Sequence, residues 1–195
     1  MGILYAMKSR RSVREYKREV VPLKKIFEIL DAGRYAPSGA NQQPWRYIVI
    51  DSEELKWRIR REAEKADKKF HESAPYWLQR WFKDQGITLE KLFLTEAPFL
   101  IVVAGFTKAP YWLESTWISI AYMTLAAQSE GLATLTYTPG STSFLNDILD
   151  IPREYCPVAI IPVGYPSEAQ KMRKRTRKSL KEITFYNKYG RGFIK

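Results

Sequence analysis

The sequence predicts a single domain that contains both helices and strands. A chain of 195 residues, 45% hydrophobic and 27% charged, is long enough to bury a core of ordinary size. Short apolar runs at 47–50, 99–104, 132–138 and 158–163 are typical of strands, and helical patterns separate them. This composition excludes a chain that is disordered throughout.

Two helices are expected before the first strand. Residues 3–9 form a short apolar segment, and the next helix opens at 21–23, where proline is tolerated in the first turn. Gly33 lies near the end of this second helix. Its apolar spacing predicts a buried stripe of Ile26, Phe27, Ile29 and Leu30.

Two further helices have serine caps. Ser52 precedes a charged helix that runs from Glu53 to about Phe70, and its alternating charges indicate a solvated face. Ser141 can cap a helix that runs to Ile151. Residues 71–96 mix helix breakers with large aromatic residues and follow no single period, so this stretch is interpreted as a mobile cover.

The stretch from about 112 to 131 predicts a helix that is apolar nearly all round. Such a helix needs burial on every side, which one small domain rarely provides. We therefore predict a homodimer with this helix at its centre, and a core helix within a monomer is the alternative. Its apolar residues are Trp117, Ile118, Ile120, Ala121, Met123, Leu125 and Ala126.

Composition narrows the classes of partner. One cysteine, Cys156, and one histidine, His71, cannot form a disulfide framework or a Cys/His zinc cluster within one chain, so no metal is expected. The net charge of +11 raises nucleic acid as a partner, but outside a cluster at 171–178 the basic residues are spread along helix faces. Basic strands interleaved with aromatic residues are absent, so a nucleic-acid partner is not expected.

The sequence also predicts that the protein lies in the cytoplasm and does not bind a membrane. No apolar run reaches the ~18 residues that a membrane-spanning helix needs. The N-terminus also lacks the pattern of a signal peptide.

Residues 36–45, Ala-Pro-Ser-Gly-Ala-Asn-Gln-Gln-Pro-Trp, form a distinctive loop. Two prolines fix φ, the centre is small, and the side-chain amides can both donate and accept hydrogen bonds. The pattern predicts a rigid loop that contacts a ligand. An ordinary connection between a helix and a strand is the alternative.

The earlier stretch 10–14, Arg-Arg-Ser-Val-Arg, predicts an anion site. Alternate residues of an extended segment share a side, so Arg10, Ser12 and Arg14 can converge on one anion. A solvated basic turn is the alternative.

These two stretches, followed in order by matches at 131–139, 162–166 and 177–183, resemble the FMN-dependent nitroreductase family. Within it the nearest likeness is to the iodotyrosine deiodinase branch. The resemblance implies an α+β fold, a three-layer α/β/α sandwich with a mostly antiparallel central sheet. It also implies an obligate homodimer with a domain-swapped C-terminal tail. Residues 1–195 would form one FMN-binding domain, with a lid at about 71–96 and a dimer arm at about 184–195.

The resemblance assigns the cofactor site. It implies that Arg10 and Ser12 approach the phosphate or ribityl chain of FMN and that Arg177 meets the phosphate. Arg14 would face the N1 and C2 carbonyl end of the flavin, where a cation stabilises the reduced anion. The hydroxyl of Thr138 would donate to flavin N5 and permit one-electron steps, which makes it the expected catalytic residue. The full set is Arg10, Arg11, Ser12, Arg14, Pro37, Ser38, Gly39, Asn41, Thr136, Tyr137, Thr138 and Arg177, of which those at 37–41 would act from the other subunit.

The resemblance also implies a substrate site under the lid. The backbone N–H of Ala40 would hold a phenolate, and Lys91 would hold the amino-acid end of a halotyrosine. A Glu and a Tyr four positions further on should assist Lys91. Glu72 and Tyr76 have this mutual spacing and are the predicted pair. Asp67 and His71, which lie at the separation from Lys91 that is usual in that branch, are the alternative. A hydrophobic lid without amino-acid specificity is a further alternative.

The function expected from this resemblance is an FMN-dependent oxidoreductase that reduces small aromatic acceptors. Its sharpest form is the reductive dehalogenation of halotyrosines. A broad nitro or quinone reductase that takes electrons from NAD(P)H is the alternative. A flavin carrier or a basic nucleic-acid-binding module on the same scaffold would belong to a different class.

Overall fold

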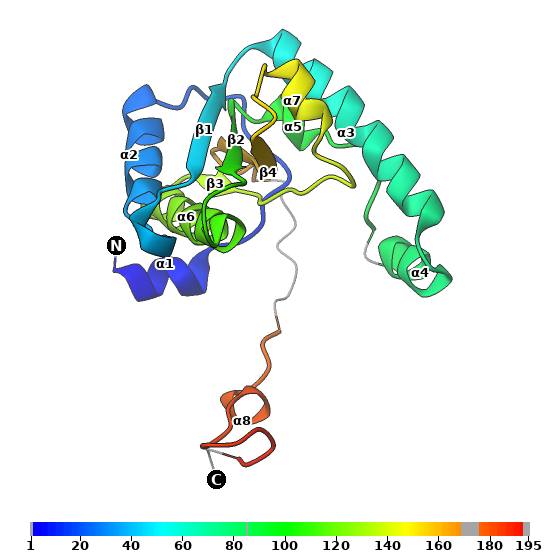
Figure 1. Ribbon diagram of the computed structural model, residues 1–195. Coiled ribbons are helices and arrows are strands. Elements are labelled where there is room, and N and C mark those ends of the chain that lie inside the picture. The colour runs from blue at the N-terminus through cyan, green and yellow to red at the C-terminus, as the bar shows by residue number, and fades with distance from the viewer. Residues whose placement is uncertain (1, 85, 169–175, 193–195) are drawn as a thin grey trace.

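The computed structural model describes residues 2–84, 86–168 and 176–192. Its centre is one sheet in the order β1-β2-β4-β3, in which every neighbouring pair is antiparallel (Figure 1). The strands are β1 Trp45–Ile50, β2 Phe99–Phe106, β3 Ala133–Thr134 and β4 Tyr155–Gly164. The mostly antiparallel sheet agrees with the sequence prediction.

Side chains of the central strand β2 alternate between two hydrophobic cores. Leu100 and Val102 point into a core that also contains Ile59 and Leu145, whereas Ile101 packs with residues of α2 and α6 on the opposite face. All residues of β2 except Phe106 are buried, as its continuous apolar run predicts. The two cores make the molecule a three-layer α/β/α sandwich.

The helices divide between these two faces (Figure 1). On one side lie α1 Ile3–Ser9, α2 Leu23–Arg34 and α6 Trp112–Ser129. On the other lie α3 Glu53–Ser73, α5 Phe93–Glu96 and α7 Phe144–Ile148. Ser52 caps α3 as predicted, because its side chain accepts a hydrogen bond from the Leu55 N–H at 3.3 Å.

Local details differ from the sequence predictions. Phe27 is 66% exposed, because Ile26 and Ile29 already occupy the face of α2 that meets the sheet. The helix expected at 141–151 is shorter, since the chain takes a positive φ of 50° at Asp150. Within the run expected as a strand at 132–138, β3 alone forms a ladder with β4, and an isolated bridge joins Tyr137 to Ile160.

The apolar helix α6 is not buried on every side within one chain. One of its faces packs on the sheet through Ile120 and Met123, whereas Trp117, Ile118 and Tyr122 are exposed. An exposed apolar face of this kind is what a second copy would cover, so the homodimer stays a prediction.

Two short helices stand away from the layers (Figure 1). Helix α4, Tyr76–Asp84, follows the end of α3 within the expected lid, and α8, Leu180–Ile183, lies on the C-terminal arm. Pro75 separates α3 from α4, which explains why no single period runs through this region. Among the described residues, no helix is both long enough and apolar enough to cross a membrane.

Candidate functional site

The arginine segment is extended, as its spacing predicts. The Val13 N–H donates to the Thr134 carbonyl at 3.1 Å, and Tyr16 forms a bridge to Pro166. Val13 and Tyr16 are buried, whereas Ser12 and Arg14 are exposed. The backbone of the segment is therefore hydrogen-bonded to the edge strand β3 and to the residues after β4, and its polar side chains face outward.

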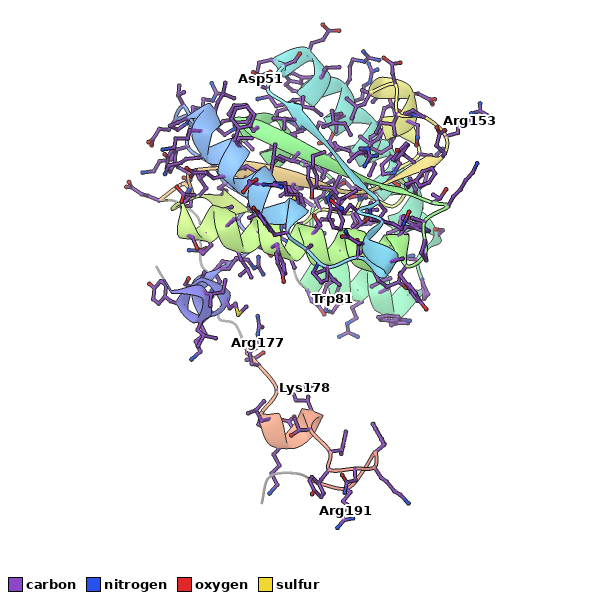
Figure 2. The ribbon with its side chains drawn as sticks, turned by 60° about the vertical axis from the view of Figure 1, so that its left-hand side comes forward. Asp51, Trp81, Arg153, Arg177, Lys178 and Arg191 are labelled. Carbon is purple, nitrogen blue, oxygen red and sulfur yellow. The ribbon has the colours of Figure 1, made fainter. Side chains whose placement is uncertain are left out.

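Arg10 and Arg177 come together from opposite ends of the chain. The pKa of Arg10 is lowered, first because the guanidinium is partly buried and then because Arg177 and Arg11 lie near it. Figure 2 shows Arg177 and Lys178 on the segment that leads from the body to α8. A cluster of guanidinium groups of this kind fits an anionic ligand.

Arg11, which the resemblance also assigns to the cofactor site, contacts the end of the preceding helix. Its Nη1 donates at 3.0, 2.9 and 3.1 Å to three carbonyls at the end of α1, those of Lys8, Ser9 and Arg10. A basic side chain is favourable at this end of a helix, where the last carbonyls lack partners. This bonding pattern had no signal in the sequence beyond the position of Arg11 directly after the helix.

The loop at 36–45 is ordered by its own contacts although much of it is exposed. Ala40, Asn41 and Gln43 take positive φ values of 49°, 53° and 46°. The Ser38 hydroxyl accepts a hydrogen bond from the Gln43 N–H at 2.9 Å. A Cβ at Gly39 would lie 2.8 Å from the Pro110 carbonyl, so only glycine fits against the chain that leads into α6.

A cavity of about 760 Å³ lies elsewhere on the same chain, between α3, α4 and the segment that follows β3. This volume suits a small aromatic ligand. Its walls combine aromatic rings with charged groups, and none of residues 36–45 lines it. The lining residues are Arg14, Glu15, Asp67, Phe70, His71, Trp81, Phe82, Gly86, Ile87, Thr88, Glu90, Lys91, Leu92, Phe93, Leu135, Thr136, Tyr137, Thr138, Pro139 and Gly140.

Thr138 is exposed on the cavity wall, and the preceding Tyr137 points into the protein. The Tyr137 ring packs edge-on against Phe93 with centroids 5.1 Å apart, and its hydroxyl donates to Asp67 Oδ2 at 2.9 Å. The pKa of Tyr137 is raised by burial and by the Asp67 carboxylate, so the hydroxyl keeps its proton. The buried tyrosine thereby fixes the backbone that carries Thr138.

The cavity contains Lys91 together with Asp67 and His71. Lys91 Nζ lies 3.0 Å from Asp67 Oδ2 and donates to the Thr88 carbonyl at 2.6 Å. Glu72 lies 3.9 Å from Lys68 on the surface, and Tyr76 is 78% exposed. Neither Glu72 nor Tyr76, the predicted pair, lines the cavity, and the structure instead brings the alternative pair, Asp67 and His71, to Lys91.

His71 stacks on Phe82 of α4, with ring centroids 4.1 Å apart and an angle of 11° between the planes. Its pKa is lowered by burial and by the positive charge of Lys91, which outweigh the opposite effect of Asp67. No signal in the sequence distinguishes Phe82 as a site residue, because an aromatic residue in an irregular stretch carries no motif.

Comparison with known proteins places this geometry in a family. The family model of the nitroreductase family matches residues 7–165. The chain belongs to the nitroreductase family. Family membership confirms the predicted fold class and makes the chain an oxidoreductase.

Several relatives within the nitroreductase family are iodotyrosine deiodinases. That of Thermotoga neapolitana is 36% identical over 186 residues, which make up 95% of this chain and 100% of the relative. That of Haliscomenobacter hydrossis is 35% identical over 175 residues, 83% of this chain and 78% of the relative. A crystal structure of oxidized iodotyrosine deiodinase bound to FMN and 3-iodo-L-tyrosine matches with a TM-score of 0.86 at 35% identity, over 94% of this chain and 100% of that chain.

Proposed function

We propose that this protein is an FMN-dependent oxidoreductase that removes halogen from halotyrosines by reduction. The observation that carries the proposal is the cavity, which places Lys91 and aromatic rings beside Thr138. The likeness to a deiodinase structure that holds FMN and 3-iodo-L-tyrosine supports it.

The arginine cluster fits the phosphate of FMN. The pKa of Arg10 is lowered first by partial burial and then by the positive charges of Arg177 and Arg11, and a bound phosphate would favour the charged guanidinium against these effects. We propose that Arg10, Ser12 and Arg177 hold this phosphate and that Arg14, which lines the cavity, faces the flavin ring. When bound, FMN would supply the electrons that reduce the acceptor.

The loop at 36–45 fits a role in the other subunit. It lies next to Pro110, at the entry to α6, and apart from the cavity of its own chain. In a dimer that covers the exposed face of α6, the loop of one subunit can reach the site of the other. We propose that Pro37, Ser38, Gly39 and Asn41 complete the cofactor site in this way and that the Ala40 N–H holds the substrate phenolate.

Within one chain, the cavity can bind the two ends of a halotyrosine differently. Phe70, Trp81 and Phe82 offer apolar surface to an aromatic ring, and Lys91 offers a cation to the amino-acid carboxylate. The Thr138 hydroxyl can donate a hydrogen bond to a group in the cavity. These residues position the reactants and exclude water, which is the main contribution of a protein to flavin chemistry.

One observation favours the second candidate, a broad nitro or quinone reductase supplied by NAD(P)H. Lys91 Nζ already has two partners within the chain, Asp67 Oδ2 at 3.0 Å and the Thr88 carbonyl at 2.6 Å, so the ammonium group does not need an amino-acid carboxylate as a partner. An uncharged nitroaromatic would not depend on Lys91. We propose NAD(P)H as the reductant in either case.

Fluorescence of bound flavin distinguishes the two candidates. Titration with 3-iodotyrosine should quench it saturably, and Lys91→Met should weaken this binding by about tenfold or more, since a hydrogen bond between charged groups contributes about 1.5–3 kcal/mol. Lys83→Met, which removes an exposed cation from α4, is the control and should bind normally. Iodide released from 3-iodotyrosine under reducing conditions would then establish the reaction.

Two results would contradict the deiodinase proposal. If a nitroaromatic of similar size binds more tightly and Lys91→Met changes neither titration, the broad reductase is the better description. If the purified protein neither carries nor takes up FMN, both candidates fail.

A further inference from the structure

A buried carboxylate, that of Asp67, bonds to both sides of the cavity at once. Its Oδ2 accepts the Tyr137 hydroxyl at 2.9 Å and lies 3.0 Å from Lys91 Nζ. Its Oδ1 accepts the Gly140 N–H at 2.8 Å. The Asp67 side chain is buried, so these contacts are protected from water.

The three partners belong to two segments that the proposed chemistry uses. Tyr137 and Gly140 flank Thr138, whereas Lys91 belongs to the expected lid, in the part that follows α4. We propose that Asp67 is a positioning residue that couples these segments, orienting Lys91 toward the substrate and Thr138 toward the cofactor. This inference rests on the proposed function for what the two segments do.

Gly140 shows how closely the loop after Thr138 is held to α3. A Cβ on Gly140 would lie 2.6 Å from the Phe70 Cβ and 2.8 Å from the Ala66 carbonyl oxygen. Glycine is therefore required for the backbone to approach Asp67 to hydrogen-bond distance. The loop cannot shift toward α3, and its bond to Asp67 opposes movement away.

A second carboxylate on α3 holds the backbone of the lid at Lys91. Glu64, one turn before Asp67, accepts the Lys91 N–H at 2.7 Å and also pairs with Arg60 at 2.7 Å. Glu64 thus fixes the backbone of Lys91, and Asp67 fixes its side chain. Of these two carboxylates, Asp67 also bonds to Tyr137 and Gly140 in the segment of Thr138.

Asparagine cannot replace the Asp67 carboxylate. Three donors, an O–H, a backbone N–H and an ammonium group, converge on its two oxygens. An amide offers one oxygen, and its NH₂ group would face a donor. Asp67→Asn therefore breaks the coupling with almost no change in side-chain size.

The test compares Asp67→Asn and Tyr137→Phe with Lys91→Met. In the FMN-loaded protein, Asp67→Asn should raise the KM for 3-iodotyrosine roughly tenfold, as expected when a bond to a charged group is lost, and should also shift the reduction potential of bound flavin. Tyr137→Phe should shift the potential in the same direction with less effect on KM. Lys91→Met should raise KM and leave the potential unchanged. Asp84→Asn, which weakens an exposed ion pair at 4.0 Å on α4, should match the wild type in both.

If Asp67 has only a structural role, Asp67→Asn should have a lower unfolding midpoint, an unchanged reduction potential and a KM within twofold of the wild type. That result would overturn the proposal. If Asp67→Asn does not fold, Tyr137→Phe decides, because an unchanged potential in that variant also contradicts the coupling. Trypsin cleavage of the flavin-free protein within 76–91 gives a readout without activity, and it should be faster in Asp67→Asn than in Asp84→Asn. If only the deiodinase proposal is wrong, the wild type will not turn over 3-iodotyrosine. The reduction potentials and the cleavage rates of the variants still test the role of Asp67 in that case.

Discussion

Side chains on the inner face of α3 decide how the cavity is lined. Ile59, Ala63 and Asp67 follow one another at the spacing of a helical stripe, so the carboxylate of Asp67 occupies a position where an apolar residue is expected. The sequence prediction named Asp67 only in the alternative pair with His71 and did not place it on a buried face, because the alternating charges of this helix indicated only a solvated face. Tyr137, the partner of Asp67, lies 70 residues away, and only the folded chain brings the two together. Lys91 and Thr138 could be proposed as site residues from the ordered motifs that surround them, and both line the cavity.

His71 gives a direct measure of charge in the cavity, because the chain has only one histidine. We predict that its pKa lies below the ordinary value of 6.5, owing to burial and to Lys91. Lys91→Met should raise this pKa and Asp67→Asn should lower it further. NMR titration of the single imidazole provides the measurement, and a value of 6.5 or above in the wild type would contradict the described environment.

The same shift predicts how acid affects stability. The folded state favours neutral His71, so the unfolded state binds more protons in the window between the lowered pKa and 6.5. Lowering the pH through this window should therefore reduce the free energy of unfolding. His71→Gln should lack this contribution, and denaturant titrations of both proteins across the window would show the difference.

At the level of elements, long apolar runs were predicted well and short segments were not. β2 and α6 formed close to their expected bounds, because their apolar runs are long and their burial is extensive. α7 and β3 are shorter than predicted, since the fold imposes a positive φ at Asp150 and an interrupted ladder before Tyr137. α4 was not predicted, because nine residues after a proline give too short a pattern.

The aromatic contacts of Phe82 hold α4 on α3. Its ring centroid lies 4.1 Å from that of His71 and 6.1 Å from that of Phe70. Phe82→Ala should weaken this docking by about 1–2 kcal/mol, since the ring is only partly buried. Limited trypsin cleavage after Arg80 and Lys83 should accelerate by roughly tenfold, because cleavage follows the population of the open form.

Trp77→Ala is the matched control for this prediction. Trp77 also belongs to α4 but is 68% exposed, so its removal should leave the cleavage rate nearly unchanged. Equal acceleration in both variants would mean that α4 is held by its general apolar surface rather than by Phe82.

At the scale of the whole molecule, the layers follow from the order of elements, but the residues proposed for the site do not all line one cavity of a single chain. The cavity beside Thr138 and the loop at 36–45 are separate, whereas the resemblance implies that both contact FMN. The C-terminal arm also leaves the layers and exposes Leu180, Ile183 and Tyr189 (Figures 1 and 2). No sequence pattern specifies which surface such an arm covers, so its contact with a partner remains a prediction.

The exposed face of α6 allows the dimer to be tested apart from the fold of one chain. Ile118 is 38% exposed, so Ile118→Glu should leave the secondary structure intact by circular dichroism. In a dimer centred on α6, the new carboxylate would be desolvated in both subunits at a cost of several kcal/mol. We therefore predict that the wild type sediments at twice the chain mass of 22.8 kDa, whereas Ile118→Glu sediments as a monomer.

Loss of the dimer should also remove FMN, because the loop at 36–45 would no longer reach the site of the partner. Val20→Glu introduces the same charge at a position that is 87% exposed and should keep both the dimer and the flavin. A monomeric Ile118→Glu that retains FMN at the wild-type ratio would show that one chain suffices to bind the cofactor. A dimeric Ile118→Glu would show instead that the subunits associate through another surface, and the aromatic residues of the C-terminal arm would be the next to substitute.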